Sequence, residues 1–147
     1  MFGLFKKVSP KSQTRTEDGR NSEIIEFVTD SLILQTTLMR DQKNELGPRA
    51  RDQWSWGYVA GFTDATLQKN GVGIDENGMA IMTVVFGVIF GLEDGTRFFG
   101  DFMRLQGADQ HLDQGMLAGG RDLFNWLNDE KGNPAPSSWL DHYHNPD

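Results

Sequence analysis

The pattern Gly-x-x-x-Gly-x-x-Asp occurs three times in this chain and constrains its fold more than any other feature. The copies are Gly57-Gly61-Asp64, Gly87-Gly91-Asp94 and Gly115-Gly119-Asp122. On an α-helix, positions i, i+4 and i+7 share one face. Each glycine inside a helix costs about 1 kcal/mol relative to alanine, and close approach of two helix backbones is the usual compensation. The pattern therefore predicts a bundle in which glycine faces pack on one another, within one chain or between two chains.

Apolar residues recur at helical spacing over most of the chain. Helices are predicted from Asn21 or Ser22 to Gly47-Pro48, from Pro48 to Asn70-Gly71, and from about Asp109 to Asn128. Residues 76–106 are ambiguous, because they combine good helix formers with Val, Ile and Phe, and Asp94-Gly95 has the composition of a hairpin turn. We predict an all-α bundle of about four to five helices. The alternative is an α+β fold with a β-hairpin around Asp94-Gly95.

Length and charge indicate one domain with two distinct ends. The 147 residues suffice for a single core. Residues 1–20 carry a net charge of +3 and are predicted to be a disordered basic arm, whereas the remainder carries −10. The helical domain is predicted to span 21–132, and the tail over 133–147 has apolar side chains with which it can dock. Such an acidic body repels phosphate backbones, so nucleic acid is not an expected partner.

The sequence shows neither a recognisable transmembrane segment nor a recognisable secretory signal. The longest apolar run, 79–92, has 14 residues, which is short of the roughly 20 that a spanning helix needs. The first residues do not have the pattern of a secretory signal. Cysteine is absent, which excludes disulfides and thiolate metal sites. We therefore expect a cytoplasmic protein without a transmembrane segment.

The three aspartates of the repeated pattern are candidate ligands. If Asp64, Asp94 and Asp122 converge, their carboxylates would suit a divalent cation such as Mg²⁺, and two of them could do acid–base work. Otherwise each one caps a helix or faces solvent. No other cofactor is predicted.

Other candidates are aromatic or lie in the tail. Trp54 and Trp56 are two residues apart, about 200° around a helix, so we expect one of them at the surface or at an interface. His142 and His144 could chelate a metal, but ordering a flexible chain end costs entropy, which favours an ordinary polar tail. No catalytic residue is predicted, because the chain has no recognisable nucleophile, phosphate-binding or metalloprotease motif.

The segment from Gly57 to Asp64, Gly-Tyr-Val-Ala-Gly-Phe-Thr-Asp, resembles a short helical signature in the Rap/Tai-type immunity proteins of bacterial secretion systems. The resemblance covers eight residues. Members of that family are typically exported and carry cysteines, and this chain has none. The resemblance implies a toxin-neutralising binding protein rather than an enzyme.

These observations favour a non-enzymatic helical interaction module that forms a homo-oligomer or binds another protein. Its contacts are expected at the glycine pairs of the pattern and at Trp54 and Trp56. One alternative is a cation-binding protein or metal-dependent enzyme built on the three aspartates. Another is a pocket for a small apolar ligand, lined by Tyr58, Phe62, Phe90 and Phe102.

Overall fold

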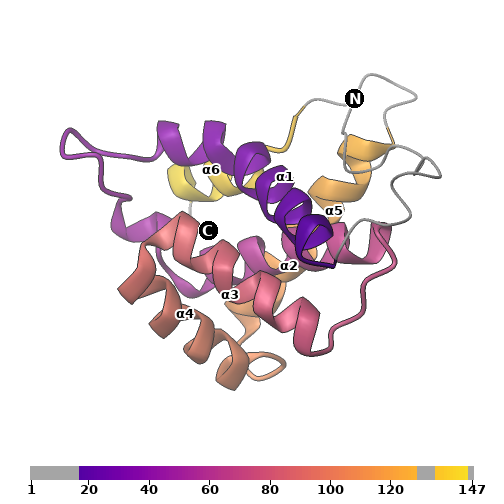
Figure 1. Ribbon diagram of the computed structural model, residues 1–147. Coiled ribbons are helices and arrows are strands. Elements are labelled where there is room, and N and C mark those ends of the chain that lie inside the picture. The colour runs from indigo at the N-terminus through magenta and orange to yellow at the C-terminus, as the bar shows by residue number, and fades with distance from the viewer. Residues whose placement is uncertain (1–16, 129–134, 146–147) are drawn as a thin grey trace.

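The computed structural model describes residues 17–128 and 135–145, and these form an all-α fold (Figure 1). Its elements are α1 (Glu17–Leu38), the short 3-10 helix η3 (Pro48–Ala50), α2 (Gln53–Lys69), α3 (Glu76–Phe90), α4 (Leu92–Leu105), α5 (Gln110–Leu127) and α6 (Ser138–His144). Within the described ranges the chain forms no β-strand. The predicted all-α bundle is confirmed.

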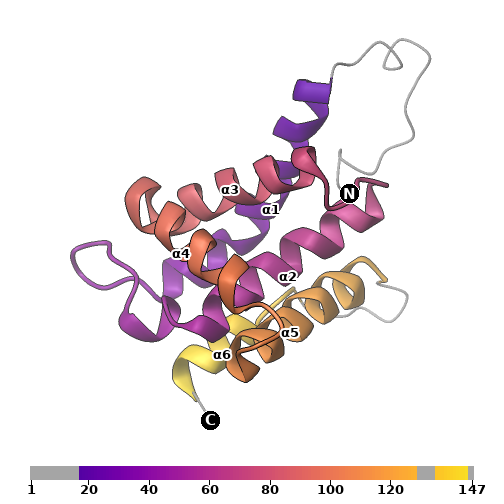
Figure 2. The same ribbon diagram turned by 90° about the horizontal axis from the view of Figure 1, so that it is seen from below.

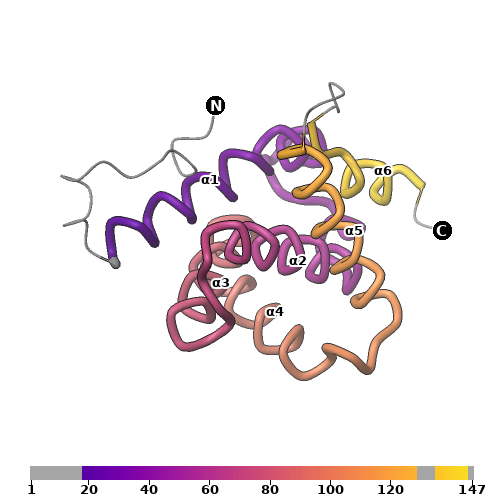
Figure 3. The backbone as a smooth tube through the Cα atoms, turned by 90° about the vertical axis from the view of Figure 1, so that its right-hand side faces the viewer, coloured from indigo at the N-terminus to yellow at the C-terminus, as the bar shows by residue number. Residues whose placement is uncertain are grey.

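Helix α2 is the central element, because α1, α3, α4 and α5 all pack on it (Figure 3). It begins after Asp52, whose carboxylate accepts a hydrogen bond from the Ser55 N–H, as expected of an N-cap residue. It ends at Lys69, Asn70 is its C-cap residue, and Gly71 follows with a φ of 68°. Most of its side chains are buried, which is typical of a helix covered on several sides.

Helices α2 and α5 lie side by side and run in the same direction (Figure 2). A Cβ atom added at Gly57 would collide with the Leu112 carbonyl oxygen, and one added at Gly115 would collide with that of Trp54. Gly61 and Gly119 meet backbone atoms of the facing helix in the same way. The α-hydrogens of these glycines point toward those oxygens, and such Cα–H···O contacts recur at close helix interfaces. The first and third copies of the pattern therefore pack on one another within the chain.

The second copy of the pattern has a different role. Gly91, with a φ of 96°, separates α3 from α4, and a Cβ atom at Gly87 or Gly91 would meet no backbone of another helix. Asp94 and Gly95 lie in the first turn of α4, where Gly95 packs on the Phe86 carbonyl. The β-hairpin alternative is therefore wrong. Aromatic side chains at helical spacing favour helices in this region. They pack together between α3 and α4: Phe86, Phe90, Phe98, Phe99 and Phe102.

Helix α1 differs from its predicted bounds at both ends. It begins at Glu17, before the predicted start at Asn21 or Ser22, and it ends at Leu38 rather than near Gly47. The chain then turns within a polar loop, in which the Asp41 carboxylate accepts hydrogen bonds from two backbone N–H groups and Asn44 adopts a φ of 63°. Short side chains that bond to nearby backbone favour such turns over a continued helix. No helix in the described part of the chain has the length and hydropathy that crossing a bilayer requires.

Substituting one contact glycine tests the α2–α5 packing. Gly57→Ala should lower the free energy of unfolding by about 3 kcal/mol, because its methyl group must push apart two backbones. Gly100→Ala is the matched control: Gly100 lies within α4 with open space around its Cα, so alanine there should stabilise the protein by about 0.5–1 kcal/mol. Urea denaturation of both variants is the measurement, and equal effects would contradict the close approach.

Candidate functional site

The α2–α5 pair has an internal two-fold relation. Gly57 meets the Leu112 carbonyl oxygen and Met116 nitrogen, while Gly115 meets the Trp54 oxygen and the Tyr58 nitrogen. The two glycines are 58 positions apart along the sequence. The same offset relates Trp54 to Leu112 and Tyr58 to Met116, so we call the members of each pair counterparts. The same offset relates Gly61 to Gly119 and Asp64 to Asp122. A pair with this relation presents two equivalent grooves, one on each side.

One of these grooves is occupied by α6, and we call it the filled groove. Its polar residues are Ser55, Tyr58 and Asp122. Ser138 at the start of α6 donates to the two Asp122 carboxylate oxygens, from its N–H at 3.0 Å and from its hydroxyl at 2.7 Å. The indole N–H of the fully buried Trp139 donates to the Ser55 hydroxyl at 2.9 Å. These contacts hold the tail against the body of the bundle.

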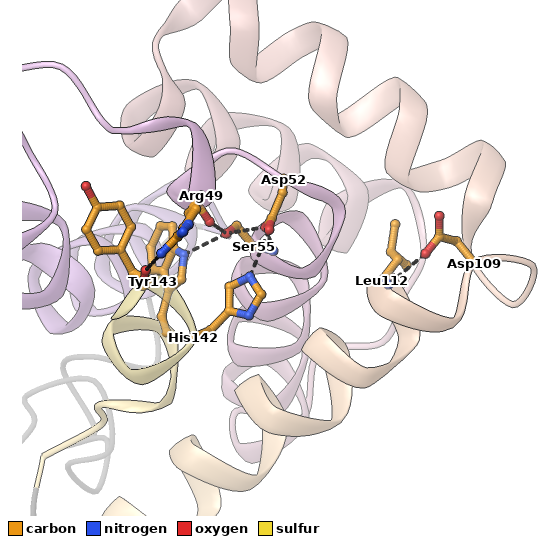
Figure 4. A network of polar contacts seen from close by, with 8 residues as sticks. Arg49, Asp52, Ser55, Asp109, Leu112, His142 and Tyr143 are labelled. Carbon is orange, nitrogen blue, oxygen red and sulfur yellow. Dashed lines mark hydrogen bonds and ion pairs between the residues drawn. The ribbon is translucent and has the colours of Figure 1, made fainter. Parts of the chain in front are cut away.

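Further along α6, His142 completes the attachment (Figure 4). Its Nε2 lies 2.8 Å from the carboxylate of Asp52, and its ring stacks on Trp54 at 4.2 Å between centroids. The histidine side chain is only 9% exposed. Asp52 also accepts from the Ser55 hydroxyl and its N–H. Serine, aspartate and histidine thus lie close together, but aspartate sits between the other two, so the histidine is not placed to take a proton from the serine.

Tyr58 is the polar centre of the filled groove. Its hydroxyl donates to Asp122 at 2.7 Å and accepts from the amide of Gln35 at 3.0 Å. Burial raises the pKa of the Tyr58 hydroxyl well above its ordinary value of 10.0, and the negative charge of Asp122 raises it further. Gln35 in turn accepts from the Leu140 N–H of α6. The network is satisfied and buried, which is typical of a structural connection.

The second groove, on the opposite side of α2 and α5, carries no segment of the described chain, and we call it the open groove. It encloses about 460 Å³. Its lining comes from α2, α5 and the turn before α5: Gly61, Asp64, Ala65, Gln68, Gln106, Gly107, Asp113, Met116, Leu117, Gly120 and Phe124. Leu117 is 71% exposed and Phe124 is 39% exposed. The open groove is thus an apolar hollow with two carboxylates at its margin.

The two grooves correspond residue by residue. Asp64 is the counterpart of Asp122, and Asp113 is the counterpart of Ser55, the two residues that hold α6 on the other side. Gly120 stands where the filled groove has Phe62, and the missing ring leaves a hollow. Asp64 accepts from Gln68 on its own helix, and Asp113 accepts from the Gly107 N–H. Each carboxylate keeps capacity for further donors, because two oxygens can accept about four hydrogen bonds.

The structure places the three aspartates of the pattern in three different surroundings. Asp122 holds α6, Asp94 pairs with Arg51 and Arg97, and Asp64 lines the open groove. Among the described residues no group of three or more histidine, aspartate or glutamate side chains is arranged to hold a metal ion.

The aromatic candidates pack within the chain. Trp56 is buried against Phe98, and Trp54 is half-buried between Tyr58 and His142. The side chains proposed to line a ligand pocket pack in the core: Tyr58, Phe62, Phe90 and Phe102. His144 is exposed beside Tyr143. Sequence reasoning missed the bond from His142 to Asp52, since 90 residues separate them, although Trp139 and Leu140 had indicated that the tail can dock.

No protein-family model, no curated protein and no solved structure matches this chain significantly.

The buried Tyr58 hydroxyl predicts a loss of stability in alkali. Above pH 10 the unfolded chain releases the tyrosine proton while the folded protein keeps it, so unfolding is favoured increasingly as pH rises toward the folded pKa. This group contributes a slope of up to about 1.4 kcal/mol per pH unit. Denaturant unfolding at several alkaline pH values should show that slope in the wild type and in Tyr143→Phe, and should lack it in Tyr58→Phe. Equal slopes in all three proteins would contradict the role given to Tyr58.

Proposed function

We propose that this protein is a non-enzymatic interaction module that binds a segment of another polypeptide in the open groove. The observation that carries the proposal is the correspondence of this groove with one that already holds a helix of the same chain. An apolar hollow with exposed Leu117 and Phe124 loses water-exposed surface when a partner covers it. A helix laid into an apolar groove is a recurring mode of peptide recognition.

The chemistry of the lining supports binding rather than catalysis. The side chains around the open groove are apolar, amide or carboxylate, without histidine, serine, threonine or a basic residue. Asp64 and Asp113 can accept hydrogen bonds and attract positive charge, but no nucleophile lies beside them to be activated. The ammonium group of Lys69 lies over the Phe124 ring at 5.9 Å. Charge and shape together suit an apolar segment that is not acidic.

Selection from a library of random peptides tests the groove directly. Peptides that bind the full chain should bind Leu117→Asp at least about ten-fold more weakly, because the change places a charge where about 1.5–3 kcal/mol of apolar burial would be gained. Leu92→Asp is the matched control: Leu92 is 83% exposed at the start of α4, outside the groove. Both variants should melt like the wild type, because surface substitutions change stability little. Peptides that bind all three proteins equally would refute the proposal.

Self-association forms the second part of the proposal. Exposed aliphatic side chains lie on α1 and α3, which pack against each other: Ile33, Leu34, Leu38, Val84 and Val88. Exposed apolar surface of this kind marks contact sites, and a symmetric dimer is the commonest assembly that covers it.

Light scattering should therefore give the mass of a dimer for the full chain. Leu34→Asp should shift the mass toward the monomer, whereas Leu117→Asp should not. The measurement is repeated with EDTA and with Mg²⁺, because a metal-dependent mass would favour the cation-binding alternative. A wild-type monomer at all concentrations would contradict self-association without affecting the open groove.

A further inference from the structure

The contacts of α6 in the filled groove indicate the chemistry of a partner for the open groove. Two consecutive residues make the polar contacts of α6 with Asp122 and Ser55: Ser138 donates twice to Asp122, and Trp139 donates to Ser55. The Trp139 ring also packs at 5.7 Å from that of Tyr58. A serine and a tryptophan at the start of a short helix are thus what this surface binds.

The open groove offers the same kinds of acceptor at the counterpart positions. Asp64 takes the place of Asp122, so it can accept from a backbone N–H and a hydroxyl at the start of a helix. Asp113 takes the place of Ser55, and a carboxylate is a stronger acceptor for an indole N–H than a hydroxyl is. Met116 takes the place of Tyr58, and a thioether packs favourably against an aromatic ring. The open groove thus keeps an acceptor for each of the polar contacts that Ser138 and Trp139 make in the filled groove.

On the basis of the proposed function, we infer that the occupant of the open groove is a short helix of a partner protein that begins with serine or threonine followed by tryptophan. Its first backbone N–H and its hydroxyl bind Asp64, its indole N–H binds Asp113, and its ring fills the hollow above Gly120. The two carboxylates and the net charge of −10 outside the first twenty residues select against an acidic segment.

The probe is a peptide with the sequence of residues 135–145 and the change Asp141→Asn, blocked at both ends so that it carries no net negative charge. The chain's own α6 is tethered and therefore outcompetes the free peptide for the filled groove. Added to the isotopically labelled full chain, the peptide should shift the amide resonances of Gly61, Leu117 and Gly120. Shifts confined to residues of the filled groove, such as Ser55 and Tyr58, would overturn the inference.

A double-mutant cycle then tests the individual contacts. Asp64→Asn in the protein and Ser138→Ala in the peptide should each weaken binding by about ten-fold, as for a hydrogen bond to a charged group, and together they should cost little more than either alone. Asp101→Asn is the control, because Asp101 pairs with Arg104 on α4 away from the groove. In the peptide, Trp139→Phe keeps an aromatic ring but removes the indole N–H. The loss of affinity that this change causes should be larger with the wild-type protein than with Asp113→Ala.

Failure of this inference is distinguishable from failure of the proposed function. If library peptides require Leu117 but lack a serine–tryptophan or threonine–tryptophan pair, the groove binds a helix of other chemistry and the inference is overturned. If binding of the 135–145 peptide is unchanged by Asp64→Asn and by Leu117→Asp, the inference is also overturned. If no peptide of either kind depends on Leu117, the proposed function fails as well.

Discussion

The close approach of α2 and α5 is the contact on which the rest of the structure depends. Four glycines let the two backbones meet, two from each helix, and each faces a backbone atom of the other helix where a side chain would collide. The conformational cost of glycine in a helix is offset by this contact and by burial of the surrounding side chains. Because α2 also packs against α1, α3 and α4, the α2–α5 pair is joined through α2 to the rest of the bundle.

The same contact creates two related surfaces on the molecule. A parallel pair with equivalent residues on both helices has two equivalent sides, and only differences in side chains distinguish them. On one side Tyr58, with Phe62 beside it, packs against Trp139. Ser55 accepts a hydrogen bond from the Trp139 indole, and the Tyr58 hydroxyl donates to Asp122. The opposite side has Met116, Gly120 and Asp113 at those positions, and no described segment covers it. The filled groove thus joins α6 to the bundle, whereas its counterpart leaves Leu117 and Phe124 exposed.

The polar residues that lie beneath α6 are bonded to it. Asp52 caps α2 and binds His142, while Ser55 in the next turn receives the Trp139 indole. Gln35 on α1 bridges Tyr58 and the backbone of α6. Buried polar groups are costly unless each has a partner, so these residues specify one docked position for α6. Elements distant in sequence, α1, α2, α5 and α6, are joined in this way.

The sequence by itself determined the helical class, the main helix ends near Gly71 and Asp109, and the importance of the glycine pattern, because capping, periodicity and glycine cost are local properties. It left open which copies of the pattern would meet. Only the tertiary structure decided that the first and third copies pack together while Gly91 breaks a helix, since this choice depends on how the phenylalanine cluster folds α4 onto α3. It also decided where the aspartates lie. Helical spacing gives the face of a side chain, but the neighbour that faces it comes from a distant part of the chain.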